Sequence, residues 1–319
     1  MKKIAVLTSG GDAPGMNAAV RAVIRMGIAK GYDVYGIYRG YAGLIDGEIE
    51  HMSVSSVADI LHRGGTILRT ARCKEFETED GRLKAKANLD KLDIDSLIVI
   101  GGDGTLRGAI EFSKLGINVM AVPGTIDNDL GYTDFTIGFD TAVNTVLSAI
   151  NNIRDTSSSH ERTTVIEVMG RNSGDIALFA AAAGGAESVL VPEVSYDIDK
   201  ICEKIIAGHK RGKLHNIIVK AEGVDISTEE LVKVLSDRTD MEAKEVVLSY
   251  LQRGGSPTAS DRLLAERTAA KAVELIDAGE RNKAVGISGT ELAVYNLEEA
   301  LKMKKPFREE LANLVEVLS

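Results

Sequence analysis

The sequence predicts an α/β fold, in which helices cover both faces of a mainly parallel sheet. Short β-branched segments alternate with longer segments of helical periodicity, which is the pattern of repeated strand and helix units. The short segments are largely apolar, as expected for strands that are buried on both faces. They are KIAVL (3–7), VYGIY (34–38), LIVI (97–100), VMAV (119–122), VIEVM (165–169), SVLV (188–191), IIVKA (217–221) and AVGI (284–287).

Residues 140–154 illustrate the helical pattern. Asp140 is placed to cap the helix N-terminus, and Arg154 is placed in its last turn. One face is apolar and is expected to pack on a sheet. That face comprises Val143, Val146, Leu147, Ile150 and Ile153.

The length of 319 residues fits one large α/β unit or two packed lobes. The composition, 44% apolar and 27% charged with 5 prolines, is that of an ordered globular enzyme. The formal net charge of -9 excludes broad binding to nucleic acid or to an anionic membrane surface. An anionic ligand must therefore meet locally placed Arg and Lys.

The N-terminal segment MKKIAVLTSGG has too short an apolar run for a signal peptide, and no apolar segment approaches the roughly 20 residues of a membrane span. We therefore expect a cytoplasmic location. The two cysteines, Cys73 and Cys202, have no metal-ligand spacing and are expected to be reduced thiols.

Two glycine-rich turns follow predicted strands. Residues 8–17 read TSGGDAPGMN, and residues 101–108 read GGDGTLRG. Glycines where a strand turns into a helix let backbone N–H groups approach a phosphate, although the first segment also fits a simple tight turn. An acid in such a turn needs a cation beside a phosphate, so Asp103 is a candidate Mg²⁺ ligand. A helix-capping role fits Asp103 as well, and the two roles are compatible.

A third loop, PGTIDND (123–129), follows the strand at 119–122. In an extended segment Asp127 and Asp129 would point the same way, which is costly without a metal or a shared proton. This pattern favours a working site, in which one acid accepts the proton of a hydroxyl acceptor. An ordinary turn rich in Asp and Asn is the alternative.

Arginines complete the set, because their planar donors suit phosphate. An arginine taken alone is more often a solvated surface residue, and it is the placement of these beside strand ends and glycine loops that favours binding. They are Arg72, Arg162, Arg171 and Arg253.

Nine motifs together resemble the bacterial 6-phosphofructokinases and extend over most of the chain. They are TSGGDAPGMNAAVRA, GGTILRTARC, GGDGT, PGTIDND, TIGFDTA, IRDTSSSHERT, EVMGRNSGDIA, AEGV and QRGGSPTASDR. The resemblance implies a homotetramer that transfers the γ-phosphoryl group of MgATP to the 1-hydroxyl of fructose 6-phosphate. It also implies two similar αβα lobes with the active site in the cleft between them. The ATP-binding lobe would comprise 1–138 and about 252–304, and the sugar-phosphate lobe 139–251 and about 305–319.

The resemblance also assigns roles to residues. Asp127 is the expected base, with Thr125 and Asp129 beside it, Arg171 stabilising the transferred group and Asp103 serving Mg²⁺. ATP would be bound by Gly11, Arg72, Cys73, Gly102, Asp103, Gly104, Thr105 and Gly108. Fructose 6-phosphate would be bound by Thr125, Ile126, Asp127, Met169, Gly170, Arg171, Glu222, Tyr250, Leu251, Gln252 and Arg253, with Arg162 and Lys244 from a neighbouring subunit.

An effector site for ADP or phosphoenolpyruvate is implied in the same way. It would comprise Arg21, Ala22, Val23, Ile24, Arg25, Arg154, Gly185, Ala186, Glu187, Arg211, Lys213, Leu214 and His215. Arg21 and Arg25 also fit a simple i, i+4 pair on an exposed helix face. Val54 differs from the basic residue that some relatives carry near this pocket.

The chain departs from the family at two substrate positions. Lys244 stands where the family usually has Arg, and Tyr250 where it has His. Lysine lacks the bidentate fork of arginine, and tyrosine is uncharged at neutral pH. We therefore expect weaker or differently tuned binding of fructose 6-phosphate.

Three alternatives differ in activity. Relatives that use pyrophosphate share the T-I-D-N-D loop but typically carry a bulky acid at the position of Gly104 and a lysine at that of Gly124, so glycines here favour ATP. NAD kinases and lipid kinases share only the short GGDGT motif. A catalytically inactive nucleotide-binding regulator would not need Asp103, Asp127 and Arg171.

Overall fold

The computed structural model describes residues 2–319, which divide into two compact units. The first unit comprises the residues up to Ile126, Leu130–Thr141 and Arg253–Lys305. The second comprises Asp127–Asp129, Ala142–Gln252 and Pro306–Ser319. The acidic loop therefore passes from one unit into the other within its own sequence.

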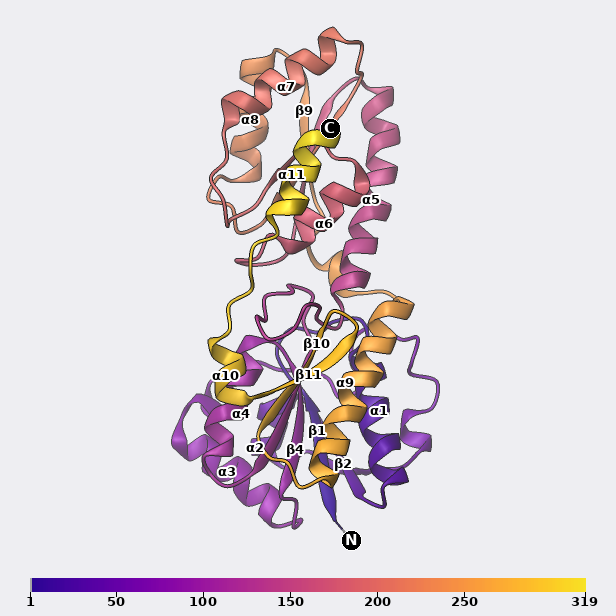
Figure 1. The fold of residues 1–319 in the computed structure, drawn as a ribbon, viewed down its shortest axis with the longest axis vertical. Helices are drawn as coiled ribbons and strands as arrows, with labels where there is room; N and C mark the ends of the chain where they lie inside the picture. Colours follow the sequence, from indigo (N-terminus) through magenta and orange to yellow (C-terminus); the bar gives the residue numbers. More distant parts are fainter. Residues whose placement is uncertain (1) are drawn as a thin grey trace. The chain divides into compact units, whose positions relative to one another are not determined.

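A seven-stranded sheet forms the centre of the first unit (Figure 1). Its order is β11-β10-β5-β4-β1-β2-β3, with parallel pairing from β10 to β2 and an antiparallel strand at each edge. The carboxyl ends of the parallel strands therefore share one edge, where ligands bind in sheets of this type. The strands are β1 (Lys3–Thr8), β2 (Asp33–Ile37), β3 (Ile49–Met52), β4 (Ser96–Gly101), β5 (Asn118–Pro123), β10 (Lys283–Ser288) and β11 (Glu291–Asn296).

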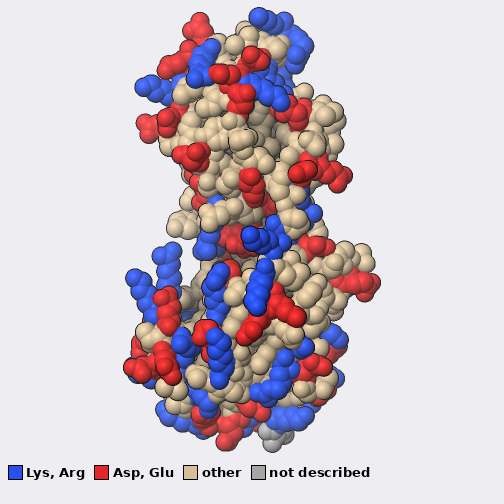
Figure 2. Space-filling model, turned by 60° about the vertical axis from the view of Figure 1, so that its left-hand side comes forward, with Lys and Arg blue, Asp and Glu red and all other residues tan. Residues whose placement is uncertain are grey.

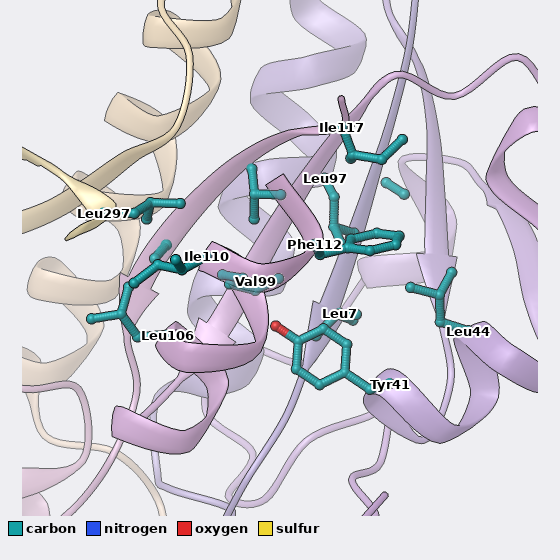
Figure 3. Packing of buried hydrophobic residues seen from close by; sticks show 14 of the residues in the cluster. Leu7, Tyr41, Leu44, Leu97, Val99, Leu106, Ile110, Phe112, Ile117 and Leu297 are labelled. Carbon is teal, nitrogen blue, oxygen red and sulfur yellow. The ribbon is translucent and has the colours of Figure 1, made fainter. Parts of the chain in front are cut away.

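Helices cover this sheet and bury its apolar strands. Figure 3 shows Leu106, Ile110 and Phe112 of α4 packed over Leu7 of β1 and Val99 of β4. Burial of side chains of this size is the main source of stability for the unit. The helices are α1 (Met16–Ala29), α2 (Gly40–Asp46), α3 (Glu79–Asp90), α4 (Asp103–Ser113), α9 (Ala259–Asp277) and α10 (Leu297–Lys302), with short 3₁₀ turns at η1 (Ser55–Val57) and η2 (Glu75–Glu77).

The second unit contains a four-stranded parallel sheet in the order β7-β8-β6-β9. Its strands are β6 (Thr163–Val168), β7 (Ser188–Leu190), β8 (Asn216–Ala221) and β9 (Ala243–Val247). The C-terminal helix α11 packs on α6 and β7. The helices are α5 (Phe139–Ser159), whose first three residues belong to the first unit, α6 (Asp175–Gly184), α7 (Ile198–Lys210), α8 (Thr228–Thr239) and α11 (Glu309–Leu318), with a 3₁₀ turn at η3 (Ser249–Arg253).

The α/β fold with mainly parallel sheets is confirmed, and all eight predicted strands are present. The predicted limits of the helix at 140–154 are wrong, because α5 covers Phe139–Ser159. Asp140 therefore lies inside the first turn and does not precede it, and Arg154 lies before the last turn. Three strands, β3, β9 and β11, were not predicted.

Acidic and basic side chains are interspersed over the face drawn in Figure 2. Within residues 2–319, no helix combines the length and the apolar character that crossing a membrane requires. Cys73 is a half-buried free thiol, and Cys202 is a buried one.

Candidate active site

The loop after β1 brings Gly11 against Arg253. A Cβ at Gly11 would collide with the Arg253 guanidinium, and Arg253 Nη1 donates to the carbonyl of Asp12 at 3.1 Å. The loop reaches α1 through Gly15, which has a φ of 101° that favours glycine. Gly11 is therefore required for the close approach of a basic side chain to this turn.

The loop after β4 presents Asp103 as the first residue of α4. Its Oδ2 accepts a hydrogen bond from Arg107 Nε at 2.8 Å, and its side chain is 44% exposed. Gly102 holds the N-cap position, so the capping role considered for Asp103 is wrong, although an acid in the first turn still suits the helix dipole. A Cβ at Gly104 would meet no atom within 4 Å, so this position borders open space.

Tyr41 supports the same loop from beneath. Its hydroxyl donates to the carbonyl of Thr105 at 2.8 Å, and burial raises the pKa of this phenol well above its usual value. A Cβ at Gly108 would lie 2.8 Å from the Tyr41 ring. Gly108 thus lets the ring pack directly on α4 and fix the backbone at Thr105.

The segment that carries Arg72 and Cys73 is joined to the β1 loop. Thr70 Oγ1 donates to the carbonyl of Gly10 at 2.6 Å. Arg72 is exposed and Cys73 is half-buried at the edge of the apolar core. The predicted ATP-binding residues therefore all belong to the first unit, after the carboxyl ends of β1 and β4 and in the segment bonded to the β1 loop.

The acidic loop follows β5 and is held by the segment before α5. Thr125 N donates to the carbonyl of Ile137 at 3.1 Å, and Thr136 Oγ1 donates to the carbonyl of Thr125 at 2.6 Å. Asn128 has a φ of 51°, so the loop is not extended there. The prediction that Asp127 and Asp129 point the same way along an extended segment is therefore wrong in its premise.

Asp127 is 3% exposed, and its Oδ2 lies 3.6 Å from Arg171 Nε. Arg171 has a φ of 53° and follows Gly170, whose φ is 138°. Both turn residues are held by one carboxylate, since Glu222 Oε1 accepts from Gly170 N at 3.2 Å and from Arg171 N at 2.9 Å. The sequence prediction thus named a base candidate and a cation that are in contact.

The other residues that were predicted to bind fructose 6-phosphate lie at two different places in the second unit. Gln252 Oε1 accepts from Met169 N at 3.2 Å, which places Gln252 at the Met169–Arg171 turn. Arg162 directly precedes β6, whereas this turn follows it, so the six residues of β6 separate them by roughly 20 Å. Lys244, on β9, lies at the same amino end as Arg162 and pairs with Glu242 at 3.0 Å.

The predicted effector residues of the second unit gather around Glu187. Arg154 Nη2 donates to the carbonyls of Gly184 at 2.5 Å and Gly185 at 2.9 Å, and Lys213 Nζ lies 2.6 Å from Glu187 Oε1. Burial lowers the pKa of the His215 imidazole, and the positive charges of Arg154 and Lys213 lower it further, while Glu187 opposes them. In the first unit, Arg21 Nη1 bonds Glu266 Oε1 at 2.8 Å, whereas Arg25 lies one turn further along α1.

Two buried acids lie within the family motifs, but the sequence assigned no role to either of them. Asp175 of EVMGRNSGDIA accepts from Asn128 Nδ2 at 2.7 Å. Asp261 of QRGGSPTASDR accepts from Gly138 N at 2.9 Å, from Thr141 N at 2.8 Å and from Thr141 Oγ1 at 2.5 Å. Both acids lie in the first turn of a helix, which is the signal that could have marked them.

The family model described as phosphofructokinase matches residues 3–276 of the chain. ATP-dependent 6-phosphofructokinases from Clostridium botulinum (strain Loch Maree / Type A3) and from Alkaliphilus metalliredigens (strain QYMF) are each 57% identical over 319 residues. The match covers 100% of both chains in each case.

Solved structures agree in fold. Phosphofructokinase from Saccharomyces cerevisiae matches with a TM-score of 0.91 at 34% identity over 100% of this chain, which spans 47% of that chain. The pyrophosphate-dependent phosphofructokinase from Marinobacter aquaeolei matches with a TM-score of 0.86 at 22% identity, over 100% of this chain and 91% of that one. The chain belongs to the phosphofructokinase family.

Proposed function

We propose that Asp127 is the general base with which the chain transfers the γ-phosphoryl group of MgATP to the 1-hydroxyl of fructose 6-phosphate. The observation that carries this proposal is the contact of a buried carboxylate with an exposed arginine. Asp127 is 3% exposed, and Arg171 Nε lies 3.6 Å away. A carboxylate can take the hydroxyl proton, and the arginine can stabilise negative charge on the transferred group.

The reaction forms a bond between the sugar oxygen and the γ-phosphorus and breaks the bond from that phosphorus to the β-phosphate bridging oxygen. Asp127 takes the proton of the attacking hydroxyl. Thr125, whose backbone is fixed by Thr136 and Ile137, aligns the loop beside the acceptor. Asp129, the other acid of the loop, would help to orient the reacting groups or the metal.

The phosphoryl donor, ATP, is assigned to the loops of the first unit. Backbone groups near Gly11 and Gly102 would approach its phosphates, and Arg72, Cys73, Thr105 and Gly108 would complete the pocket. Open space at Gly104 supports a nucleotide, because a bulky acid would fill it. A Cβ at Gly124 would lie 3.0 Å from the side chains of Ile100 and Met16, so a lysine would not fit there without rearrangement.

Asp103 would hold Mg²⁺ for the donor. One exposed carboxylate at a helix N-terminus suits this ion, which keeps several waters and takes other ligands from phosphate groups. The ion supplies charge neutralisation on the donor phosphates. Arg107, now bonded to Asp103, must then release that carboxylate.

The acceptor is assigned to the Met169–Arg171 turn with Glu222, Gln252 and Arg253, and to Tyr250 and Leu251 of η3. Arg162 and Lys244 lie at the opposite end of the β6 strand, which supports their action in the site of a neighbouring subunit of a homotetramer. ADP or phosphoenolpyruvate would bind at the effector residues. The reaction with free sugar phosphates supports a cytoplasmic location.

A coupled assay of fructose 1,6-bisphosphate formation tests the base. Asp127→Ser should lower kcat by on the order of 10²–10⁴, because proton removal loses its acceptor. The matched control is Asp155→Ser, which changes an exposed aspartate of α5 in the same unit and should retain full activity. A folded Asp127→Ser enzyme with kcat within threefold of the unaltered chain would overturn the assignment.

A further inference from the structure

Asn128 separates the two acids of the catalytic loop and has an unusual backbone. It is 0% exposed, and its φ of 51° lies in the left-handed region, which only Gly, Asn and Asp adopt readily. The conformation of this residue determines the directions in which Asp127 and Asp129 leave the chain. Something must hold it there, because the same segment could otherwise extend.

The side chain of Asn128 supplies that restraint. Its Nδ2 donates to Asp175 Oδ2 at 2.7 Å, and both residues are buried, with Asp175 only 4% exposed. A hydrogen bond between an amide and a buried carboxyl group is costly to lose, because the partner that remains is desolvated and unsatisfied. The bond spans 47 residues of sequence and ties the loop to a helix.

Asp175 is itself fixed in place. It is the first residue of α6, where a negative charge is favoured by the helix dipole, and its N–H donates to Ser173 Oγ at 3.3 Å. Arg308, from the C-terminal segment, has its Nε 4.0 Å from Asp175 Oδ2 and its guanidinium 5.2 Å from the centre of the Phe179 ring. A cation that stacks on a ring one turn further along α6 therefore lies beside the buried Asp175 carboxyl group.

We propose that Asp175 is a positioning residue for the phosphoryl transfer. Through Asn128 it holds the loop in the left-handed turn that directs the Asp127 carboxylate toward the acceptor hydroxyl. The inference rests on the proposed role of Asp127 as the base. It predicts that breaking the bond lowers kcat, whereas a bond that only stabilises the fold would lower stability alone.

Asn128→Gly removes the hydrogen bond to Asp175 but keeps a residue that readily adopts a φ of 51°. The variant therefore tests the hydrogen bond without adding backbone strain. We expect kcat to fall on the order of 10- to 100-fold, which is the range for loss of a charge-assisted hydrogen bond. The KM values for ATP and fructose 6-phosphate should change by less than about threefold.

Asn282→Gly is a matched control. Asn282 also has a left-handed φ, of 55°, and its Oδ1 accepts from Val119 N at 3.0 Å, at the amino end of β5 and far along the strand from the loop. The same chemical change there removes a hydrogen bond and should lower the midpoint of thermal unfolding, with kcat within twofold of the unaltered chain.

A swapped pair supplies the second test. Asn128→Asp alone places two carboxylates against each other and should lower kcat at least as much as Asn128→Gly. Combining it with Asp175→Asn restores one amide-to-carboxylate bond of reversed polarity and should recover at least tenfold of the loss. This comparison decides the question even where Asn128→Gly yields little folded protein.

The proposal is overturned if Asn128→Gly keeps kcat within twofold, or if the swapped pair is no more active than Asn128→Asp. Such results leave the base assignment standing as long as Asp127→Ser is inactive. An active Asp127→Ser enzyme would instead refute the base, whatever the state of the Asn128 bond.

Discussion

Lys244 and Tyr250 are solvent-exposed side chains of the second unit. Lys244 Nζ pairs with Glu242 Oε1 at 3.0 Å, and Tyr250 is 76% exposed. An exposed pair of this kind contributes little to stability, so Lys244 is free to exchange Glu242 for a phosphate. These two side chains determine how firmly the acceptor is held in our assignment.

The double variant Lys244→Arg with Tyr250→His should lower the KM for fructose 6-phosphate. Arginine binds phosphate through two parallel hydrogen bonds, and histidine adds a donor that can carry charge. We expect a decrease of about threefold to tenfold, with the KM for ATP unchanged, as measured by initial rates at varied sugar phosphate. An unchanged or higher KM for fructose 6-phosphate would contradict the assignment of both positions.

At the residue scale, the sequence was sufficient to name the chemical groups but not their directions. The resemblance to the family assigns roles in one site to Asp127 and Arg171, and the two side chains are indeed paired. The turn between Asp127 and Asp129 does not follow from the motifs, because Asn128, which has a φ of 51°, bonds to Asp175, 47 residues later in the chain. Local patterns carry no information about a restraint from so distant a residue.

At the scale of elements, hydrogen bonds join the N-terminal ends of helices α5 and α9. Asp261, in the first turn of α9, accepts from Gly138 N, directly before α5, and from Thr141 N, in the first turn of α5. In return, Thr258, the N-cap of α9, donates to Asp140 Oδ2 at 2.5 Å. Ile137, next to Gly138, pairs with Thr125, so these hydrogen bonds also support the acidic loop.

Asp261 should make stability depend on pH. Burial raises the pKa of this carboxyl to about 6, although its three hydrogen bonds oppose the change. In the unfolded chain the pKa is the ordinary value of about 4, so the folded state binds more protons between about pH 4 and pH 6. The contribution of Asp261 to stability is therefore full below pH 4 and is lost as the pH rises through 6.

Asp261→Asn removes this titration. Its free energy of unfolding, relative to that of the unaltered chain, should rise by about 3 kcal/mol between pH 4 and pH 7. Urea denaturation of both proteins at several pH values measures the difference. Asp277→Asn, at the exposed end of the same helix, provides the control. A difference between Asp261→Asn and the unaltered chain that does not vary with pH would refute the shifted pKa.

The strands that sequence patterns did not predict lie at sheet edges. β3 and β11 are the two edges of the seven-stranded sheet, and β9 is an edge of the four-stranded one. Such strands have one solvated side and carry polar residues, as in IEHM and AKEVV, so they lack a continuous apolar run. The other strands were predictable because their segments are largely apolar, as burial beneath helices favours.

At the scale of the whole molecule, the division into units leaves little trace in the sequence. The chain changes unit after Ile126, Asp129, Thr141, Gln252 and Lys305, and one of these boundaries falls inside α5. A regular helix carries no composition change at such a point. The lobe boundaries were therefore expected only from the resemblance to the family. The expected tetramer and the expected effector response also rest on that resemblance alone.

Effector binding should respond to pH through His215. Burial lowers the pKa of this imidazole, so the ring is neutral at pH 7. A bound anion beside it would stabilise the charged ring, so binding would take up a proton and tighten as the pH falls from 8 to 6. The affinity for phosphoenolpyruvate or ADP, measured by calorimetry, should gain about threefold to tenfold over the same change in His215→Asn. Protonation of the ligand affects both proteins equally, so an affinity ratio that is constant with pH would remove His215 from the effector site.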